Sequence, residues 1–590
     1  MKLLAIAALV LLATGSTGAA SSVDPGVGNV PQGTQTDTAY SQSFQTAGVT
    51  NIFATTQQTS CYRPEVAAPF NDGPANAYDG ESACSGAATT GEDTGAAGPY
   101  ATQVGSNPGY PMTAPQLVKD HSESDIRVDP TNPLHLIGSS KWFVSAEGYN
   151  HLLGFYESFD GGKTWPVQGH IPGYEGWTDN TDPVGAFDGF GNFYELNLPY
   201  QFFYRADGSH NFTVGSSQEP NPVQPAEVIS VAVRPHGSTT AGRWITTHNG
   251  EPDFVATTDS IGNEPDKQWI TIDDNPSSPH YNRVYAMWVD FHGPFTPVPF
   301  VSYADAMADG THTDWSAPQP LPVPPHSPQG VTYLLPHVDA SGNVYTTITN
   351  EDPAHSAFSV TISVDRSTDG GKTWTTTGNA ASDVTPPPGR YPNTTFRDGI
   401  ENTFGVAANG TLYVAYEDYS AGVGNILLTR STDGGATWST PIQVNDNASA
   451  VDEFQPNLTV AADGTVSVAF YDRRLACPTT GTTEGTAAGI GLDSGPASGA
   501  SNYCVNSSIQ FYAPDLTPIG HNVRLTQHTW DPQLNAPHTG SPGGTTTFIG
   551  DYFGNTASGS TDVTTFTSTY NDGSNPAHRQ QQVVAKVPIP

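Results

Sequence analysis

Short alternating runs of apolar and polar residues recur along the chain from about residue 125 onward, and they come in pairs separated by a turn that contains Gly or Asn. Such pairs are typical of antiparallel strands joined by tight turns. Seven pairs can be counted: 125–128 with 134–137, 183–187 with 192–195, 268–272 with 283–288, 333–338 with 343–348, 403–407 with 411–416, 457–461 with 465–471, and 548–553 with 562–566. No stretch longer than a turn or two has the periodicity of an amphipathic helix, so the pattern predicts an all-β protein.

A repeated turn follows the alternating runs in three places. Its copies read SFDGGKTW, STDGGKTW and STDGGATW and occupy residues 158–165, 367–374 and 431–438. The Asp side chain of such a turn can accept hydrogen bonds from turn amides, the glycines take positive φ, and the Trp packs back as an apolar plug. A turn repeated in this way indicates a repeat architecture.

These copies resemble the Asp box, S-x-D-x-G-x-T-W, of sialidases and other β-propellers. Further phrases are similar to a secreted subgroup of sialidase-like repeat proteins, and the resemblance covers about residues 120 to 585. These phrases lie at 128–133, 266–270, 471–474 and 550–554. In that family the box is a structural turn away from the active site, so the resemblance implies a fold more directly than a function.

The spacing of the repeated turns predicts the number of blades. Asp160 and Asp369 are 209 residues apart, whereas Asp369 and Asp433 are 64 apart, so the first interval spans three units and the second spans one. We therefore expect a β-propeller of seven four-stranded blades, with six as the alternative if the terminal pieces share a blade. Pairing of N- and C-terminal segments should close the ring, because an open propeller leaves an unpaired edge.

Composition narrows the class of partner. The 590 residues are 36% hydrophobic and 10% aromatic, which suits a large globular core. Only 21 Lys and Arg stand against 57 Asp and Glu, giving a net charge of −36. This balance argues against nucleic acid or an anionic membrane surface as the partner.

The N-terminal segment predicts the compartment. Residues 1–20 combine one lysine, an apolar stretch and small residues, as a secretory signal peptide does. Residues 21–115 have little periodicity and form a low-complexity lead-in, and 116–590 form the propeller. No later segment approaches the roughly 20 apolar residues of a membrane span. We expect a secreted, extracellular protein without a membrane span, with a monomer favoured.

The four cysteines fit an oxidising compartment. Cys61 with Cys84 and Cys477 with Cys504 are close in sequence, so two local disulfides are the simplest of three pairings. The second pair encloses a loop, 477–504, that follows the second strand of the sixth unit. We expect a disulfide-pinned flap over the mouth of the propeller that could gate substrate, with a tolerated surface insertion as the alternative.

Polar residues gather where inner strands begin and second strands end, which is one face of a propeller. The mouth is therefore predicted to be acidic with a few arginines and aromatic rings, and such a surface suits carbohydrate. The candidate substrate-binding residues are Trp142, Asp266, Lys267, Trp269, Asp452, Glu453 and Asp551. The alternative for any one of them is a structural role, since aspartates at strand ends commonly cap turns.

The resemblance also implies catalytic roles. Sialidases clamp a substrate carboxylate with three arginines and use a Tyr nucleophile primed by a Glu, with an Asp as acid and base. Carried over, these roles fall on Arg397 and Arg473 as clamp, Asp182 as acid, and Glu401 with Tyr552 as nucleophile. The family's first arginine lies in an Arg-Ile-Pro phrase, and the nearest phrase here is 127–130, Arg-Val-Asp-Pro.

The sequence thus favours a secreted sialidase-like glycoside hydrolase acting on extracellular glycans through carboxylates at the mouth. A non-catalytic propeller that binds glycan or protein is the first alternative. A polysaccharide lyase, with Tyr552 as base and Arg473 as charge neutraliser, is the second. No cofactor is required for any of these activities, and Ca2+ between neighbouring acidic loops is an open alternative.

Overall fold

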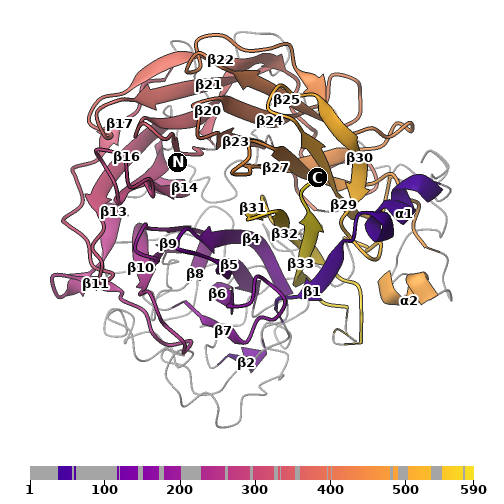
Figure 1. Cartoon of the computed structure of the whole chain (residues 1–590), viewed down its shortest axis with the longest axis horizontal. Helices are drawn as coiled ribbons and strands as arrows, with labels where there is room; N and C mark the ends of the chain where they lie inside the picture. The colour runs from indigo at the N-terminus through magenta and orange to yellow at the C-terminus, as the bar shows by residue number, and fades with distance from the viewer. Residues whose placement is uncertain are drawn as a thin grey trace, which may run out of the picture.

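The protein is a seven-bladed β-propeller, seen along its short axis in Figure 1 of the computed structural model. The structure describes residues 37–55, 59–60, 116–117, 120–143, 151–171, 179–200, 227–258, 263–292, 297–323, 330–332, 334–352, 359–394, 396–399, 401–478, 483–488, 502–532, 548–573, 575 and 578–590. Each blade is an antiparallel sheet whose first strand lies nearest the central axis. The expectation of seven four-stranded blades is confirmed.

The first four blades follow one another along the chain. Blade 1 contains β4 (Asp120–Asp129), β5 (Asn132–Phe143), β6 (His151–Ser158) and β7 (Val167–His170). Blade 2 contains β8 (Asp179–Phe187), β9 (Phe193–Tyr200), β10 (Glu227–Arg234) and β13 (Phe254–Thr258). Blade 3 contains β14 (Asn263–Ile272), β15 (Arg283–His292), β16 (Val298–Asp305) and β17 (Gln319–Pro320). Blade 4 contains β20 (Val344–Asp352), β21 (Ser359–Ser367) and β22 (Thr375–Val384), and its inner position is shared by β18 (Gly330–Thr332) and β19 (His337–Val338).

The remaining blades complete the ring. Blade 5 contains β23 (Asn402–Val406), β24 (Leu412–Asp418), β25 (Asn425–Ser431) and β26 (Ile442–Gln443). Blade 6 contains β27 (Glu453–Val460), β28 (Val466–Asp472), β29 (Asn506–Tyr512) and β30 (Pro518–Arg524). Blade 7 contains β31 (Asn555–Ser558), β32 (Thr561–Ser568), β33 (Gln581–Pro588) and β1 (Thr50–Phe53). Outside the blades lie the short pairs β2 (Thr59–Ser60) with β3 (Gln116–Leu117) and β11 (Thr247–His248) with β12 (Glu251–Pro252), and the helices α1 (Thr38–Thr46) and α2 (Thr483–Ala488).

The N-terminal strand closes the ring, as expected. β1 runs antiparallel to β33, with Thr50 opposite Lys586 and Phe53 opposite Val583, and Figure 1 shows the indigo strand beside the yellow one. The segment assigned to the lead-in thus contains a strand of blade 7 and the helix α1 beside it. The boundary expected at residue 116 separates segments that the structure joins in one ring.

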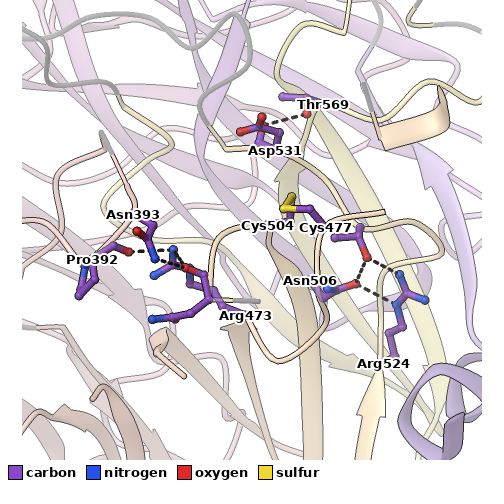
Figure 2. The surroundings of a disulfide bond; sticks show 11 residues. Pro392, Asn393, Arg473, Cys477, Cys504, Asn506, Arg524, Asp531 and Thr569 are labelled. Atoms are coloured by element: carbon purple, nitrogen blue, oxygen red, sulfur yellow. Dashed lines mark hydrogen bonds between the residues drawn. A yellow bond between two sulfur atoms is a disulfide. The ribbon is translucent and has the colours of Figure 1, made fainter. Parts of the chain in front are cut away.

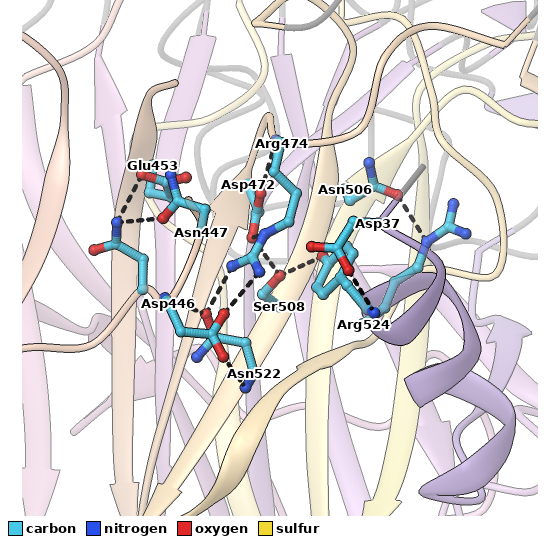
Figure 3. A network of polar contacts seen from close by, with 12 residues as sticks. Asp37, Asp446, Asn447, Glu453, Asp472, Arg474, Asn506, Ser508, Asn522 and Arg524 are labelled. Carbon is cyan, nitrogen blue, oxygen red and sulfur yellow. Dashed lines mark hydrogen bonds and ion pairs between the residues drawn. The ribbon is translucent and has the colours of Figure 1, made fainter. Parts of the chain in front are cut away.

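Helix α1 docks on blade 6 through a polar network around Arg474 (Figure 3). The guanidinium contacts Asp472 at 2.8 Å and both Asp446 and Asn522 at 2.7 Å. Tyr40 of α1 is buried, and its ring lies 4.2 Å from the Arg474 guanidinium carbon. Its hydroxyl also contacts Ser508, so the helix is fixed by a cation–π contact and a hydrogen bond. The alternating pattern gave no sign of this nine-residue helix.

The first strand of blade 7 corrects one prediction. The sequence pattern placed it at 548–553, but β31 begins at Asn555. Ile549 and Phe553 are buried core residues, so their apolar character reflects packing between blades rather than strand pairing. A Cβ on Gly550, whose φ is +106°, would lie 2.7 Å from the Glu123 amide nitrogen. The segment therefore approaches the backbone of β4 closely, which only glycine permits.

The three repeated turns share one hydrogen-bond pattern. In the first, Asp160 accepts from the Thr164 amide at 2.9 Å and from its hydroxyl at 2.7 Å, while the Ser158 hydroxyl accepts from the Gly162 amide at 2.8 Å. Trp165 packs edge-on against Tyr156 with ring centroids 5.3 Å apart. These turns join the third and fourth strands, at the opposite end of the blades from the start of the inner strands.

Candidate functional site at the mouth of the propeller

A cavity of about 260 Å3 lies along the inner strands. It extends along β14 from Trp269 to Ile272 and on to Asp274, which follows the strand, and Glu401, Asp551 and Tyr552 also line it. Trp269 and Tyr552 meet edge to face with their ring centroids 5.4 Å apart. The end of the cavity where the inner strands begin therefore combines aromatic faces with carboxylates.

Four inner strands carry the same distortion at this end. The residues Glu123, Asp182, Lys267 and Gln455 have left-handed φ values of 48°, 56°, 55° and 48°. Each lies at a register shift between the first and second strands of its blade. A bulge of this kind redirects a side chain out of the ladder, and a left-handed non-glycine residue is uncommon. In each of blades 1, 2, 3 and 6, the bulge thus directs one polar side chain out of the strand ladder at the mouth.

A continuous chain of polar contacts joins these residues across blades 1 to 3. Lys141 lies 3.6 Å from Glu123 and donates to the Thr181 hydroxyl at 2.6 Å. Thr181 in turn donates to Asp182 at 2.5 Å, and Lys267 lies 4.0 Å from the same carboxylate. The Lys141–Thr181 contact joins blade 1 to blade 2, and the Lys267–Asp182 contact joins blade 3 to blade 2, so the charges of these three blades are coupled.

Asp551 extends this chain to blades 5 and 7. Its carboxylate lies 3.3 Å from Lys267 Nζ and accepts two hydrogen bonds from Arg397, at 3.1 Å from Nε and 2.5 Å from Nη2. Burial alone would raise the pKa of Asp551, but the Arg397 and Lys267 cations hold it well below its usual range. Asp551 is therefore an ionised centre that ties three blades together.

Neighbouring carboxyls at the mouth have opposite pKa shifts. Burial raises the pKa of Asp266 to about 6, and the nearby Asp182 adds to this rise. For Asp182, burial is outweighed by the Lys267 and Lys141 cations and by the Thr181 hydrogen bond, so its pKa is lowered. Burial raises the pKa of Glu123 to about 8 in spite of Lys141. In mildly acidic solution Asp182 is ionised while Asp266 holds a proton, which is the division of roles that acid–base catalysis requires.

A second group of carboxyls, Asp398, Glu401 and Glu417, is called the acidic triad below. One carboxylate oxygen of each lies within 4.8 Å of the others, and all three residues are buried. Glu417 accepts from the Gln455 amide and from the Tyr391 hydroxyl, the latter at 3.1 Å. Burial raises the pKa of Asp398 to about 8 and raises those of Glu401 and Glu417 well above the ordinary value.

Five of the residues assigned from the sequence form one group: Asp182, Asp266, Lys267, Arg397 and Asp551. Three more line the cavity beside them: Trp269, Glu401 and Tyr552. Glu123, Lys141 and Gln455 also belong to the mouth, although the sequence analysis gave them no role. Their signal was positional, since Glu123 and Gln455 occupy the same place near the start of their inner strands as Asp182 and Lys267.

Trp142 lies apart from this group. Its side chain is 1% exposed and packs with Ile137 and Leu153, and its indole nitrogen donates to Ser140 at 3.2 Å. A ring so enclosed by its own blade has no face to offer a ligand.

Arg473, Asp452 and Glu453 form a separate buried group, and Figure 2 shows Arg473 beside Pro392 and Asn393. Arg473 contacts Asp452 at 3.1 Å and donates to the carbonyls of Pro392, at 3.0 Å, and Asn502. Glu453 accepts from Asn445 at 2.9 Å. Neither Arg473 nor Asp452 has any exposed side-chain surface, so the guanidinium fixes the connection rather than facing the cavity.

The Tyr552 hydroxyl is hydrogen-bonded to a main-chain carbonyl and not to a carboxylate that could deprotonate it. Its hydroxyl donates to the Pro183 carbonyl at 3.0 Å. Burial raises its pKa well above the usual value, and the carboxylates of Glu123 and Asp182 raise it further. Glu401 lies in the acidic triad instead. The arrangement holds the phenol in its neutral form and leaves the Glu401–Tyr552 nucleophile without structural support.

The predicted disulfide between Cys477 and Cys504 is confirmed, with its Cα atoms 5.2 Å apart. The connection that it closes joins the second and third strands of blade 6 and includes α2. The pairing expected for Cys61 and Cys84 and the signal peptide at 1–20 lie outside the described residues. In the described ranges, no helix is long and apolar enough to cross a membrane.

Comparisons with known proteins give similarity of fold. No family model matches the sequence, and no curated protein matches it. Similar solved structures include a protein of unknown function from Dyadobacter fermentans, with 12% identity and a TM-score of 0.41 over 80% of this chain and 96% of that one. The NanB sialidase of Streptococcus pneumoniae has 12% identity and a TM-score of 0.38, over 80% and 69% of the two chains. The polysaccharide lyase Uly1 has 10% identity and a TM-score of 0.41, over 80% and 91%. Similarity at this level leaves the activity open.

Proposed function

We propose that the protein is a secreted glycoside hydrolase that acts on extracellular glycans at the mouth of its central cavity. The observation that carries the proposal is the pair Asp182 and Asp266, two carboxyls that share a hydrogen bond and have opposite pKa shifts; Asp266 lies three residues before Trp269, which lines the cavity. Glycosidases need one carboxyl that holds a proton and one that is ionised. An aromatic face next to them gives a sugar ring a surface on which to stack.

The chemistry follows from the protonation states. Asp266, with a pKa of about 6, is the general acid that protonates the oxygen of the leaving sugar. Asp182 stays ionised beside Asp266, with which it shares a hydrogen bond, and its negative charge favours the positive charge that develops on the sugar. The backbone of Asp182 and of Lys267 is left-handed, and the Lys267 amide donates to the Asp266 carboxyl at 2.6 Å, so both carboxyls are held in place before substrate arrives.

The cations of the mouth favour an acidic sugar. With Asp266 and Glu123 protonated, Lys141, Lys267 and Arg397 face the ionised Asp182 and Asp551, which leaves one positive charge in excess. Side-chain exposure rises from 8% for Lys141 to 17% for Lys267 and 32% for Arg397. Arg397 is therefore the cation best placed to meet a carboxylate of a sialic or uronic acid.

The test is release of sugar by the purified protein from sialosides, uronic glycosides and neutral glycosides, at pH 5 and pH 7.5. We expect release from an acidic glycan, with a higher rate at pH 5, and loss of at least about a hundredfold in kcat for Asp266→Asn and Asp182→Asn. The control is Asp365→Asn, which replaces a buried carboxyl of β21 away from the cavity. If both mouth variants keep the rate of the control, the assignment is wrong.

A non-catalytic glycan-binding propeller is the second candidate. Two contacts favour it: the Tyr552 hydroxyl is bound to a carbonyl, and Arg397 is bound to Asp551. Groups that are hydrogen-bonded within the protein are less available for catalysis. This function predicts affinity for a glycan without turnover. Trp269→Ala should then weaken binding by about tenfold or more, whereas Phe159→Ala, which removes an exposed ring from the opposite face, should not. Equal affinity of the two variants would count against it.

A further inference from the structure

The acidic triad is buried, and among the described residues the Lys267 cation compensates the Glu401 carboxyl only in part. Asp398, Glu401 and Glu417 are 8%, 3% and 0% exposed. The ion pairs recorded for the described residues include none to these three carboxyls, although the mouth beside them contains several. Burying carboxyls in this way is costly unless a cation, a proton or hydrogen bonds compensate.

Two members of the triad have unused oxygens. Asp398 Oδ2 and Glu401 Oε1 are buried and have no hydrogen-bond partner within the described part of the chain. Glu417 differs, because the Gln455 amide and the Tyr391 hydroxyl bind its two oxygens and fix its orientation. Buried polar atoms without a partner call for an explanation such as an ion. The triad therefore has one anchored carboxyl and two with free coordination capacity.

The geometry suits a single cation. Calcium binds oxygen at 2.3–2.6 Å, so two oxygens on opposite sides of one ion are about 5 Å apart. The three carboxylate oxygens of the triad lie within 4.8 Å of one another, so all three can reach the same ion. An all-oxygen donor set selects a hard cation over zinc or copper.

The surroundings provide further ligands and a route of entry. Glu401 lines the 260 Å3 cavity, so water can complete a coordination shell that needs six to eight oxygens. Carboxylate oxygens up to 4.8 Å apart can surround a calcium ion. They do not require the shorter bonds and strict octahedral geometry of magnesium.

We propose that Asp398, Glu401 and Glu417 bind one calcium ion in the wall of the cavity. The ion compensates three negative charges with two positive ones and joins β24 to the segment that precedes β23. Because Arg397 is the neighbour of Asp398, the ion also holds the backbone that presents Arg397 to Asp551 at the mouth. Binding of the ion is independent of the glycan activity proposed above and can be measured without a substrate.

The experiment uses the mature protein after removal of metal with a chelator. Terbium(III), a luminescent substitute for calcium, is titrated with excitation of tyrosine, because the Tyr391 hydroxyl lies 3.1 Å from Glu417. Calcium and magnesium then compete for the site, and thermal unfolding is recorded with each ion. The variants are Glu401→Gln and Asp398→Asn, which keep size and shape, and Asp365→Asn is the control.

We expect one saturable terbium site in the wild type and in the control, displaced by calcium and raising the unfolding temperature when filled. Each triad variant should weaken it by at least about tenfold, as loss of a metal-site group commonly does. Absence of a saturable site, titration of both variants like the wild type, or displacement by magnesium but not calcium would overturn the proposal. Should one variant fail to fold by circular dichroism, the other decides, since each removes one negative charge from the site.

Discussion

The substitution Asp551→Asn tests the charged centre of the mouth most sharply. It removes the carboxylate that Arg397 binds through two hydrogen bonds and that Lys267 approaches to 3.3 Å. Breaking a buried ion pair from one side costs about 3–5 kcal/mol because the partner charge stays buried and unpaired. Arg397 keeps 32% of its side-chain surface and Lys267 keeps 17%, so water compensates part of the loss. We expect the free energy of unfolding to fall by about 2–3 kcal/mol at pH 7.

The assay is equilibrium unfolding in urea followed by tryptophan fluorescence. The matched control is Asp305→Asn, which also removes a carboxylate bound by one arginine, Arg283, at 2.7 Å and 3.1 Å. Asp305 is 49% exposed, so its loss should cost no more than about 1 kcal/mol. Equal losses for the two variants would refute the account of Asp551 as a buried centre.

The pH dependence gives an independent check. Because the pKa of Asp551 is lowered in the folded protein, its stabilisation is fully present above the unfolded pKa of about 3.9 and is lost as pH falls towards the folded value. The difference between wild type and Asp551→Asn should therefore be constant from pH 5 to 7 and shrink below pH 4. A difference that grows as pH falls would contradict the shift.

Three further predictions concern separate parts of the molecule. Because burial raises the pKa of Asp266 to about 6, kcat should fall as pH rises above 6, and a pH–rate profile without this limb would exclude Asp266 as the acid. Cys477→Ser removes the disulfide to Cys504, which lies 27 residues further along the chain, and should lower the free energy of unfolding in urea by about 3 kcal/mol. An unchanged free energy would mean that other contacts fix the loop. Tyr40→Ala removes a buried ring from Arg474 and should cost about 3 kcal/mol, with Tyr40→Phe costing less; equal costs for the two would show that the hydroxyl, not the ring, holds α1.

The local patterns of the sequence predicted the blades well. Strand alternation and the repeated turns depend on neighbouring residues, and the seven pairs of strands correspond to seven sheets with one displaced first strand. The exception at 548–553 arose because Ile549 and Phe553 are buried by packing between blades, which gives the same apolar pattern as a strand. Helix α1 was missed because its stability comes from contacts with blade 6 rather than from its own apolar face.

The candidate site was predicted less completely because it depends on contacts between blades. The sequence could place Asp182, Lys267 and Asp551 at one end of the propeller, but it could not show that Lys267 lies between the two carboxylates. Trp142 and Arg473 also lie near this end. Whether a side chain points to the cavity or into its own blade depends on β-bulges, and the local sequence pattern did not predict these bulges. The acidic triad likewise combines two positions close in sequence with one on the next strand.

The most direct test of the central claim is the initial rate of sugar release from an acidic glycan at pH 5 by wild type, Asp182→Asn, Asp266→Asn and Asp365→Asn. The account predicts turnover by the wild type and the Asp365 variant and loss of turnover in both mouth variants, with unchanged circular dichroism. Turnover that survives in both mouth variants, or its absence from the wild type on every glycan of the panel, would contradict it.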